Sequence, residues 1–349
     1  MHSLRARASL RQSIGHGRSM DVLQRIALLD GQLIRTGRPT NSGGERRAAR
    51  LRGTVALHHG YHIAAERWRA ADRTDRQLAR ILAVRAAARG DIVFSHSSAA
   101  VLLGLPLYEA NLDVVHITEP RGGAARRTGA LLRHRSELDT DDIVEVGGLR
   151  CTSPERTLLD LARFVSVEDA LACADGHLRG SFRVGRQVDT ATVAEWRDRL
   201  ERRLDDLVGA RGVRGAREML RLADPRKDSV LESVSHLRLV RLGFEVELQV
   251  PVRGPEHYDY YVDFRFVGLR LFGECDGASK YTDASLMNGL SPAQLVYREK
   301  RRQDWICGST RNEMIRWGYS DVCSELGFAR RLHAFRVPIP WPPRGLVLR

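Results

Sequence analysis

The sequence predicts a mixed α/β (α+β) protein with more than one domain. Its 349 residues exceed the usual size of a single domain, and a hydrophobic fraction of 43% is sufficient for real cores. Helical and strand-like patterns alternate along most of the chain. The last third predicts a helix, three strands, a helix and one more strand, which is an α/β layer pattern.

The chain begins with a basic region. Residues 1–60 contain eleven arginines against three acids, within a formal net charge of +13. A basic excess at one end is typical of a protein that binds a polyanion such as DNA. An arginine-biased surface that only confers solubility is the alternative. Residues 1–19 are rich in arginine and serine, so we expect a disordered extension there, with Met20 as an alternative start.

Residues 20–72 are expected to form a winged-helix-like DNA-binding domain. The helical stretch DVLQRIALL precedes a polar Gly/Ser/Pro segment, a basic stretch and a short hairpin, in which Gly53 and Gly60 occupy turn positions. Arginines of the basic stretch would contact the phosphate backbone of DNA. The nucleic-acid-binding residues expected here are Arg46, Arg47, Arg50 and Arg52.

Residues 73–224 are expected to form a second α/β module. It begins with a helix, a short strand and a further helix that has Ser95 as its N-cap. Two strand-like segments, NLDVVHIT and ALLRHRS, flank a basic turn and are predicted to pair as a hairpin. Another helix starts at Ser153 and Pro154, charged helices follow, and the turn PRKD marks a domain boundary.

Residues 225–337 would form the last domain, with residues 338–349 as a tail. The amphipathic helix SVLESVSHLRLVRLGF precedes the strand-like segments EVELQVPV, YYVDFRF and RLFGECDG. A helix with Ser291 as N-cap and Pro292 in its first turn follows, and NEMIRWGYSDV is predicted to be a strand.

Two of these strands are predicted to form a hairpin that concentrates carboxylates. With the turn at Gly-Leu in FVGLRL, Asp263 lies opposite Glu274, and alternation puts Asp276 on the same face. Directly opposed like charges are destabilising, so a divalent cation, Mg²⁺ or Mn²⁺, is the favoured explanation. A shifted register, or neutralisation by Arg265 and Arg270, is the alternative. The opposite face, expected in the core, carries Val262, Phe264, Phe266, Leu271 and Cys275.

Further residues extend this hypothetical site. The chain has three lysines among 56 basic residues, and Lys280 follows the hairpin acids closely. A lysine can lower its pKa and deprotonate or position a water molecule, whereas arginine stays protonated. Glu232, in the preceding helix, is either a further metal-binding acid or an exposed charge. The basic residues of the following helix, which would neutralise backbone phosphates, are Lys300, Arg301 and Arg302.

The motifs of this last part resemble a nuclease family. VDF…GECDGASKY…EKRRQD…IRWGYSDV resembles the very-short-patch-repair-endonuclease-like domain of actinobacterial proteins, a member of the PD-(D/E)xK superfamily. This resemblance implies a restriction-endonuclease-like α/β/α domain that hydrolyses phosphodiesters with a divalent metal. The superfamily's acid, then acid-x-lysine, resembles Asp263, then Glu274-Cys275-Asp276. Asp276 stands where lysine is usual, so Lys280 would have to take over that role.

The upstream motifs resemble a different family. FSHSSAAVLLGLP, VHITEPRGGAARR and GLRCTSPERTLLDLA are similar to the AbiEi-like group of type IV abortive-infection antitoxins. In that group an N-terminal winged helix binds DNA and represses the operon. The resemblance implies an α/β antitoxin-like module, DNA as a partner, and either a cognate toxin or a second copy of the chain as a protein partner.

Three functions therefore remain open. In the first, a DNA endonuclease, Asp263, Glu274 and Glu232 hold the metal, and Asp276 and Lys280 complete the catalytic set. In the second, an antitoxin-like transcriptional repressor, the nuclease fold is inactive. A third role, neutralisation of a nucleotidyltransferase toxin, requires no metal.

Composition sets the expected compartment. No apolar stretch approaches the roughly 20 residues of a membrane span, and the five cysteines are scattered singly, without disulfide or zinc spacing. We therefore expect a cytoplasmic protein without a membrane partner. Histidines show no metal-binding spacing either: His96 is expected to cap or pack a helix, and His58, His59 and His62 to be exposed or to contact phosphate.

Overall fold

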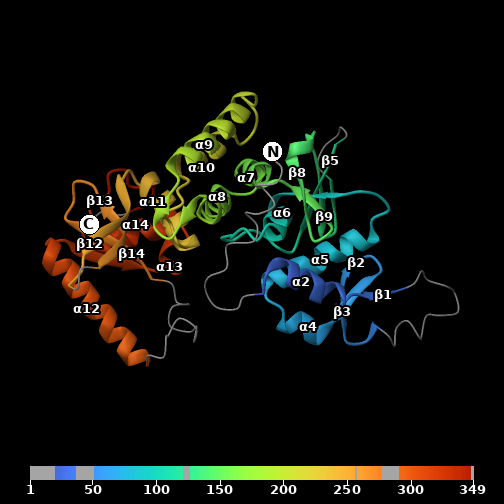
Figure 1. Cartoon of the computed structure of the whole chain (residues 1–349), viewed down its shortest axis with the longest axis horizontal. Coiled ribbons are helices and arrows are strands. Elements are labelled where there is room, and N and C mark those ends of the chain that lie inside the picture. Colours follow the sequence, from blue (N-terminus) through green and yellow to red (C-terminus); the bar gives the residue numbers. More distant parts are fainter. Residues whose placement is uncertain (1–19, 37–50, 121–125, 256–257, 277–290, 347–349) are drawn as a thin grey trace. The chain divides into compact units, whose positions relative to one another are not determined.

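The computed structural model describes residues 20–36, 51–120, 126–255, 258–276 and 291–346. The chain divides into two compact units. The amino-terminal unit comprises Ser19–Cys173 and Leu200–Met219, and the carboxy-terminal unit contains Ala174–Arg199 and the chain from Leu220 onward. Helices and sheets occur in both units (Figure 1), so the predicted α/β (α+β) fold class is confirmed.

The amino-terminal unit begins with a helix and a small three-stranded sheet. The strands pair antiparallel in the order β1-β3-β2, and the hairpin β2–β3 is called the wing below. Gly53 and Gly60 have φ angles of +77° and +79° at the predicted turn positions, where a side chain would be strained. The elements are α2 (Val22–Asp30), β1 (Ile34–Arg35), β2 (Thr54–His58), β3 (Tyr61–Ala64) and α4 (Ala65–Ala70).

A six-stranded mixed sheet follows in the order β6-β7-β5-β4-β9-β8. Ser95 stands at the predicted N-cap position of the second helix, but its side chain makes no capping hydrogen bond there. Ser153 accepts a hydrogen bond from Arg156 N at the start of the third helix, as a cap does. The helices are α5 (Arg73–Ala87), α6 (His96–Leu102) and α7 (Pro154–Phe164). The strands are β4 (Val93–Phe94), β5 (Val115–Glu119), β6 (Arg126–Thr128), β7 (Leu131–Arg135), β8 (Ile143–Val146) and β9 (Leu149–Thr152).

The hairpin predicted between NLDVVHIT and ALLRHRS is wrong. The two segments are β5 and β7, and they pair in parallel, with Val115 opposite Leu131. The antiparallel partner of β7 is β6, a three-residue strand inside the predicted basic turn. All three residues of β6 are exposed, so no apolar alternation marked it as a strand in the sequence.

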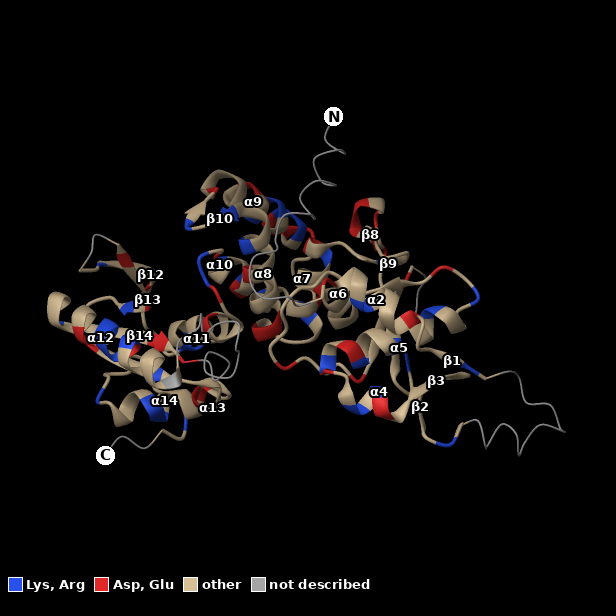
Figure 2. Ribbon diagram, turned by 60° about the horizontal axis from the view of Figure 1, so that its bottom comes forward, with Lys and Arg blue, Asp and Glu red and all other residues tan. Residues whose placement is uncertain are grey.

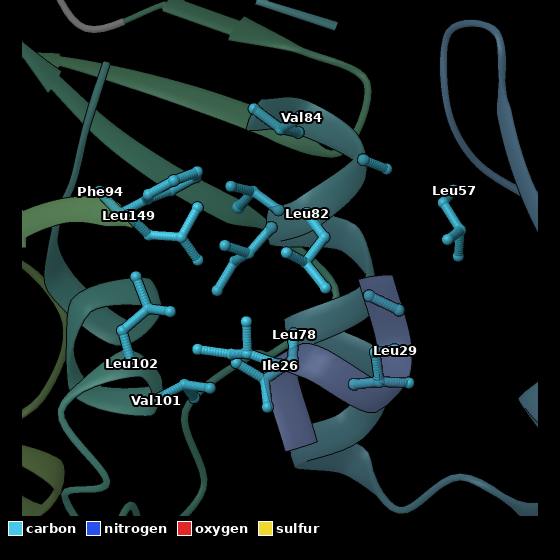
Figure 3. Packing of buried hydrophobic residues seen from close by; sticks show 14 of the residues in the cluster. Ile26, Leu29, Leu57, Leu78, Leu82, Val84, Phe94, Val101, Leu102 and Leu149 are labelled. Atoms are coloured by element: carbon cyan, nitrogen blue, oxygen red, sulfur yellow. The ribbon is translucent and has the colours of Figure 1, made fainter. Parts of the chain in front are cut away.

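One hydrophobic cluster joins the small sheet to the larger one. Figure 3 shows Ile26 of α2 beside Leu78 of α5, and Phe94 of β4 beside Leu149 of β9. Leu57 of the wing belongs to the same cluster. The wing and the strands downstream therefore share a core, which fixes the base of the wing against α5.

Three helices cross the division between the units. They are α8 (Val167–Phe182), α9 (Thr190–Asp205) and α10 (Val213–Leu222). The short strands β10 (Arg183–Val184) and β11 (Gln187–Val188) form a hairpin between α8 and α9. Among the helices that the structure describes, none combines the length and the apolarity that a membrane crossing requires.

The carboxy-terminal unit contains a four-stranded sheet in the order β12-β13-β14-β15, in which β14 and β15 are parallel and the other pairs antiparallel. The N-caps Ser229 and Ser291 hold the first turns of its two long helices. The last predicted strand ends early, and its YSDV portion is helical. The elements are α11 (Val230–Arg241), β12 (Val246–Arg253), β13 (Asp259–Phe266), β14 (Leu271–Cys275), α12 (Pro292–Thr310), β15 (Glu313–Trp317), α13 (Tyr319–Val322) and α14 (Glu325–Ala334).

Candidate functional site

The predicted DNA-contacting arginines lie in the segment that joins β1 to β2. Arg52 is exposed immediately before the wing. Arg46, Arg47 and Arg50 lie outside the described residues. On α12, Lys300 and Arg301 are exposed, and Figure 2 shows Lys and Arg positions, coloured blue, recurring along the ribbon of this helix. Among the predicted contact residues that the structure describes, the exposed ones are therefore Arg52, just before the wing, and Lys300 and Arg301 on α12.

The carboxylate hairpin has the predicted register. β13 and β14 pair with Phe264 opposite Gly273, and continuing that register places Asp263 opposite Glu274. The turn is centred one residue earlier than predicted, because Leu269 N donates to Phe266 O at 3.2 Å. The strand pairing predicted from the turn is thus correct, whereas the contacts of the two acids differ from the prediction.

Glu274 is bound by arginines. Its side chain is only 9% exposed, and its Oε1 and Oε2 lie 2.6 Å from Arg302 Nη2 and 2.8 Å from Arg316 Nη2. Glu299 of α12 pairs with both of these arginines. Burial favours a raised pKa at Glu299, but the hydrogen bond from Arg316 and the charge of Arg302 outweigh it and lower that pKa. The carboxylates of Glu274 and Glu299 are therefore neutralised by the two guanidiniums, and the four side chains come from β14, α12 and β15.

Asp263 belongs to a different group of contacts. Gln249 Nε2 donates to Asp263 Oδ1 at 3.1 Å and to Glu232 Oε2 at 2.9 Å. Asp263 Oδ2 also accepts a hydrogen bond from Cys275 N at 2.8 Å. Gln249 has a left-handed φ of +50°, a conformation that is strained for a side chain of this size. The side-chain amide of Gln249 thus links Glu232 to Asp263 by donating a hydrogen bond to each.

Glu232 is held at the start of α11 by its own N-terminal turn. Ser229 Oγ donates to its Oε1 at 2.8 Å, and Asp228 N donates to its Oε2 at 3.0 Å. Burial raises the pKa of Glu232 in spite of these bonds. The alternative of an exposed helix charge is therefore wrong for Glu232.

The two hairpin acids accordingly have separate partners: Glu274 of β14 pairs with arginines of α12 and β15, whereas Asp263 of β13 is joined through β12 to α11. Strand alternation is interrupted here: Val262 belongs to a cluster with Ile306 of α12, whereas Phe264 contacts Trp317, whose indole donates to Ser235 of α11. Among described residues, no group of three or more converging His, Cys, Asp or Glu ligand atoms includes these carboxylates.

The remaining residues of the predicted site differ in their burial and in their contacts. Asp276 is half-buried, and its backbone N donates to Trp317 O at 2.8 Å. Lys280 lies outside the described residues. Arg302, expected to contact phosphate, is engaged by Glu274, and Arg265, considered as a neutralising partner, pairs with Glu247 instead. Phosphate contact by α12 would thus rely on its exposed residues Lys300 and Arg301.

A buried lysine that the sequence interpretation missed fixes the start of α11. Lys227 Nζ lies 2.7 Å from Asp175 Oδ2, and both side chains are 1% exposed. Lys227 Nζ also donates to Leu222 O at 2.9 Å and lies 3.3 Å from His236 Nδ1. Burial raises the pKa of Asp175 to about 6 and, with the nearby Lys227 charge, lowers that of His236 to about 3. The scarcity of lysine was the signal that could have identified Lys227.

Comparison with known proteins finds a protein family that matches part of the chain. Residues 92–222, from just before β4 to the end of α10, match the AbiEi antitoxin C-terminal domain. Two uncharacterized proteins from strains of Mycobacterium tuberculosis are each 32% identical to this chain over 198 residues. The match covers 56% of this chain and 67% of each relative.

Proposed function

We propose that this chain, which belongs to the family of the two mycobacterial proteins and carries an AbiEi antitoxin C-terminal domain, is the DNA-binding antitoxin-type component of a toxin–antitoxin or abortive-infection system. The observation that carries the proposal is the small sheet of order β1-β3-β2 upstream of this domain. The sequence between β1 and β2 is basic and the wing follows it directly, and both features support a DNA-binding module.

The charge distribution favours contact with the DNA backbone. The sequence between β1 and β2 carries Arg46, Arg47, Arg50 and Arg52. Arginine side chains that contact phosphates release condensed counterions, so they supply affinity without sequence preference. The wing, which follows these arginines in the sequence, is anchored in the core through Leu57.

Binding of the full chain to duplex DNA is expected to weaken steeply as salt rises. If all four arginines contact phosphates, a plot of log affinity against log salt has a slope of about −3 to −4. Fluorescence anisotropy of a labelled duplex, titrated between roughly 50 and 200 mM salt, measures this slope. An affinity independent of salt would contradict a basic DNA interface.

The carboxy-terminal unit has a second candidate function, metal-dependent phosphodiester cleavage. Two observations favour it: the order α11-β12-β13-β14-α12-β15 with its parallel last pair, and the joining of Glu232 to Asp263 through Gln249. Asp263, Glu274 and Glu232 would bind Mg²⁺ or Mn²⁺, and Asp276 and Lys280 would complete the catalytic set. The fit is incomplete, because Arg302 and Arg316 must first release Glu274.

Metal binding by this site is expected to depend on Asp263. We expect Mn²⁺ to bind the wild-type chain in calorimetry and to bind Asp263→Asn at least about tenfold more weakly, since a neutral amide replaces one of the hard ligands. Glu247→Gln is the matched control, because Glu247 is a half-exposed acid on β12 that pairs with Arg265. Plasmid nicking is assayed on the same samples.

The outcomes of this experiment separate the two functions. Loss of metal binding and nicking in Asp263→Asn, with both retained in Glu247→Gln, supports cleavage by the hairpin acids. A wild-type chain that binds no Mn²⁺ contradicts the nuclease candidate and leaves DNA-binding regulation as the function of the chain.

A further inference from the structure

Three histidines converge in the AbiEi domain. His116 on β5 and His134 on β7 belong to parallel neighbours in which Thr118 is opposite His134. The two side chains are therefore two positions apart on one face of the sheet. His96 begins α6 directly after β4, where Ser95 N donates to His116 O at 3.0 Å. One ring nitrogen from each histidine lies within 4.8 Å of the other two.

The rings of the three histidines are in direct contact. His116 Nδ1 and His134 Nε2 lie 2.9 Å apart, a hydrogen-bond distance at which one nitrogen donates its N–H to the lone pair of the other. The ring of His96 stacks on His134 with a centroid separation of 3.7 Å. Three imidazoles from three separate segments of the chain thus form one cluster inside the unit.

His96 has an unsatisfied nitrogen and a strained backbone. Its side chain is 2% exposed; Nδ1 lies 3.0 Å from Ser95 Oγ, and Nε2 is buried without a hydrogen-bond partner. A buried nitrogen that has lost water and gained no partner is destabilising. The φ of His96 is +52°, in the left-handed region, where residues other than glycine are held only when the surroundings enforce it. A bond between a ligand and Nε2 would offset the free-energy cost of the unpaired nitrogen and of the strained backbone.

We propose that His96, His116 and His134 bind a divalent transition-metal ion, and that Zn²⁺ is the ion that they fit. Three imidazoles with a fourth position left to water or an external ligand make a common zinc coordination set. Tetrahedral bonds of about 2.0–2.1 Å separate ligand nitrogens by roughly 3.3 Å. His116 and His134 would move apart by a few tenths of an ångström, and the His96 ring would rotate out of its stack.

This site differs in chemistry from the carboxylate hairpin. Imidazole nitrogen suits zinc and its neighbours in the first transition series, whereas carboxylate oxygen suits Mg²⁺ and Mn²⁺. The histidine site also lies within the segment that matches the antitoxin family, residues 92–222. Its occupation can therefore be tested independently of DNA binding and of metal-dependent cleavage.

The test is a metal titration of the chelator-treated full-length chain. We expect one equivalent of Zn²⁺ to bind in calorimetry, and Co²⁺ to give the visible absorption of a four-coordinate nitrogen site without the charge-transfer bands of thiolates. His116→Gln/His134→Gln is expected to lose at least about 100-fold in Zn²⁺ affinity, because two of three ligands are removed. His58→Gln/His59→Gln, which removes two wing histidines, is expected to bind Zn²⁺ like wild type.

Each result decides the proposal. A folded wild-type chain that binds no Zn²⁺ and gives no cobalt spectrum overturns it, and the three histidines are then a metal-free hydrogen-bonded cluster. Binding that survives in the His116/His134 variant but is lost in the wing variant also overturns it. If the double variant fails to fold by circular dichroism, His134→Gln alone replaces it, because His134 is only partly buried.

Discussion

Replacing Lys227 by methionine is expected to lower the free energy of unfolding of the carboxy-terminal unit by about 3–5 kcal/mol. Methionine has a similar volume but leaves Asp175 without its ion-pair partner in a site where both side chains are 1% exposed. The carbonyl of Leu222 also loses its donor. Denaturant unfolding, followed by circular dichroism and the fluorescence of buried Trp196 and Trp317, measures the change.

Two further variants test the cause of this loss. Lys300→Met removes an exposed lysine of α12 and is expected to change stability by less than about 0.5 kcal/mol. Lys227→Met/Asp175→Asn is expected to recover part of the loss, because asparagine carries no charge but can still accept the hydrogen bond from Asp224 N. Equal destabilisation by Lys300→Met would show that Lys227 has no special role.

The largest expected functional effect comes from Arg46→Ala/Arg47→Ala/Arg50→Ala. If each arginine contacts one phosphate, the triple variant should reduce the salt slope of DNA binding by about 3 and weaken affinity on the order of 100-fold at about 0.15 M salt. The loss should be similar for all DNA sequences, since phosphate contacts carry no sequence information. The anisotropy titration described above measures both quantities.

The matched control removes the same charge elsewhere. Arg202→Ala/Arg211→Ala/Arg214→Ala changes three exposed arginines in and between α9 and α10. A local interface at the winged segment predicts a much smaller loss for this control. If the two triple variants weaken binding equally, net charge rather than the segment between β1 and β2 determines affinity.

Local features of the fold were predictable from the sequence. Ser153 and Ser291 each cap a helix where predicted, because a cap depends on a side chain and the backbone within three residues. The register of the carboxylate hairpin was also predicted correctly, although its turn lies one residue earlier than predicted.

Features that depend on distant segments were not predictable in this way. The parallel pairing of β5 with β7 brings His116 beside His134, and the antiparallel hairpin predicted for these segments concealed that contact. Arg302 and Arg316, which pair with Glu274, follow the end of the hairpin by more than twenty residues in the sequence. Lys227 stands in a turn-like sequence, and only the folded chain shows that Asp175 lies against it.

The central claim is that this chain is an antitoxin-type protein that recognises DNA, and one measurement tests it most directly. The full chain is titrated by anisotropy against the duplex upstream of its own gene and against a shuffled duplex of equal length and composition, at the same salt concentration. The account predicts a preference for the upstream sequence of about 10³-fold or more. Equal affinity for the two duplexes, or no binding at low salt, would contradict it.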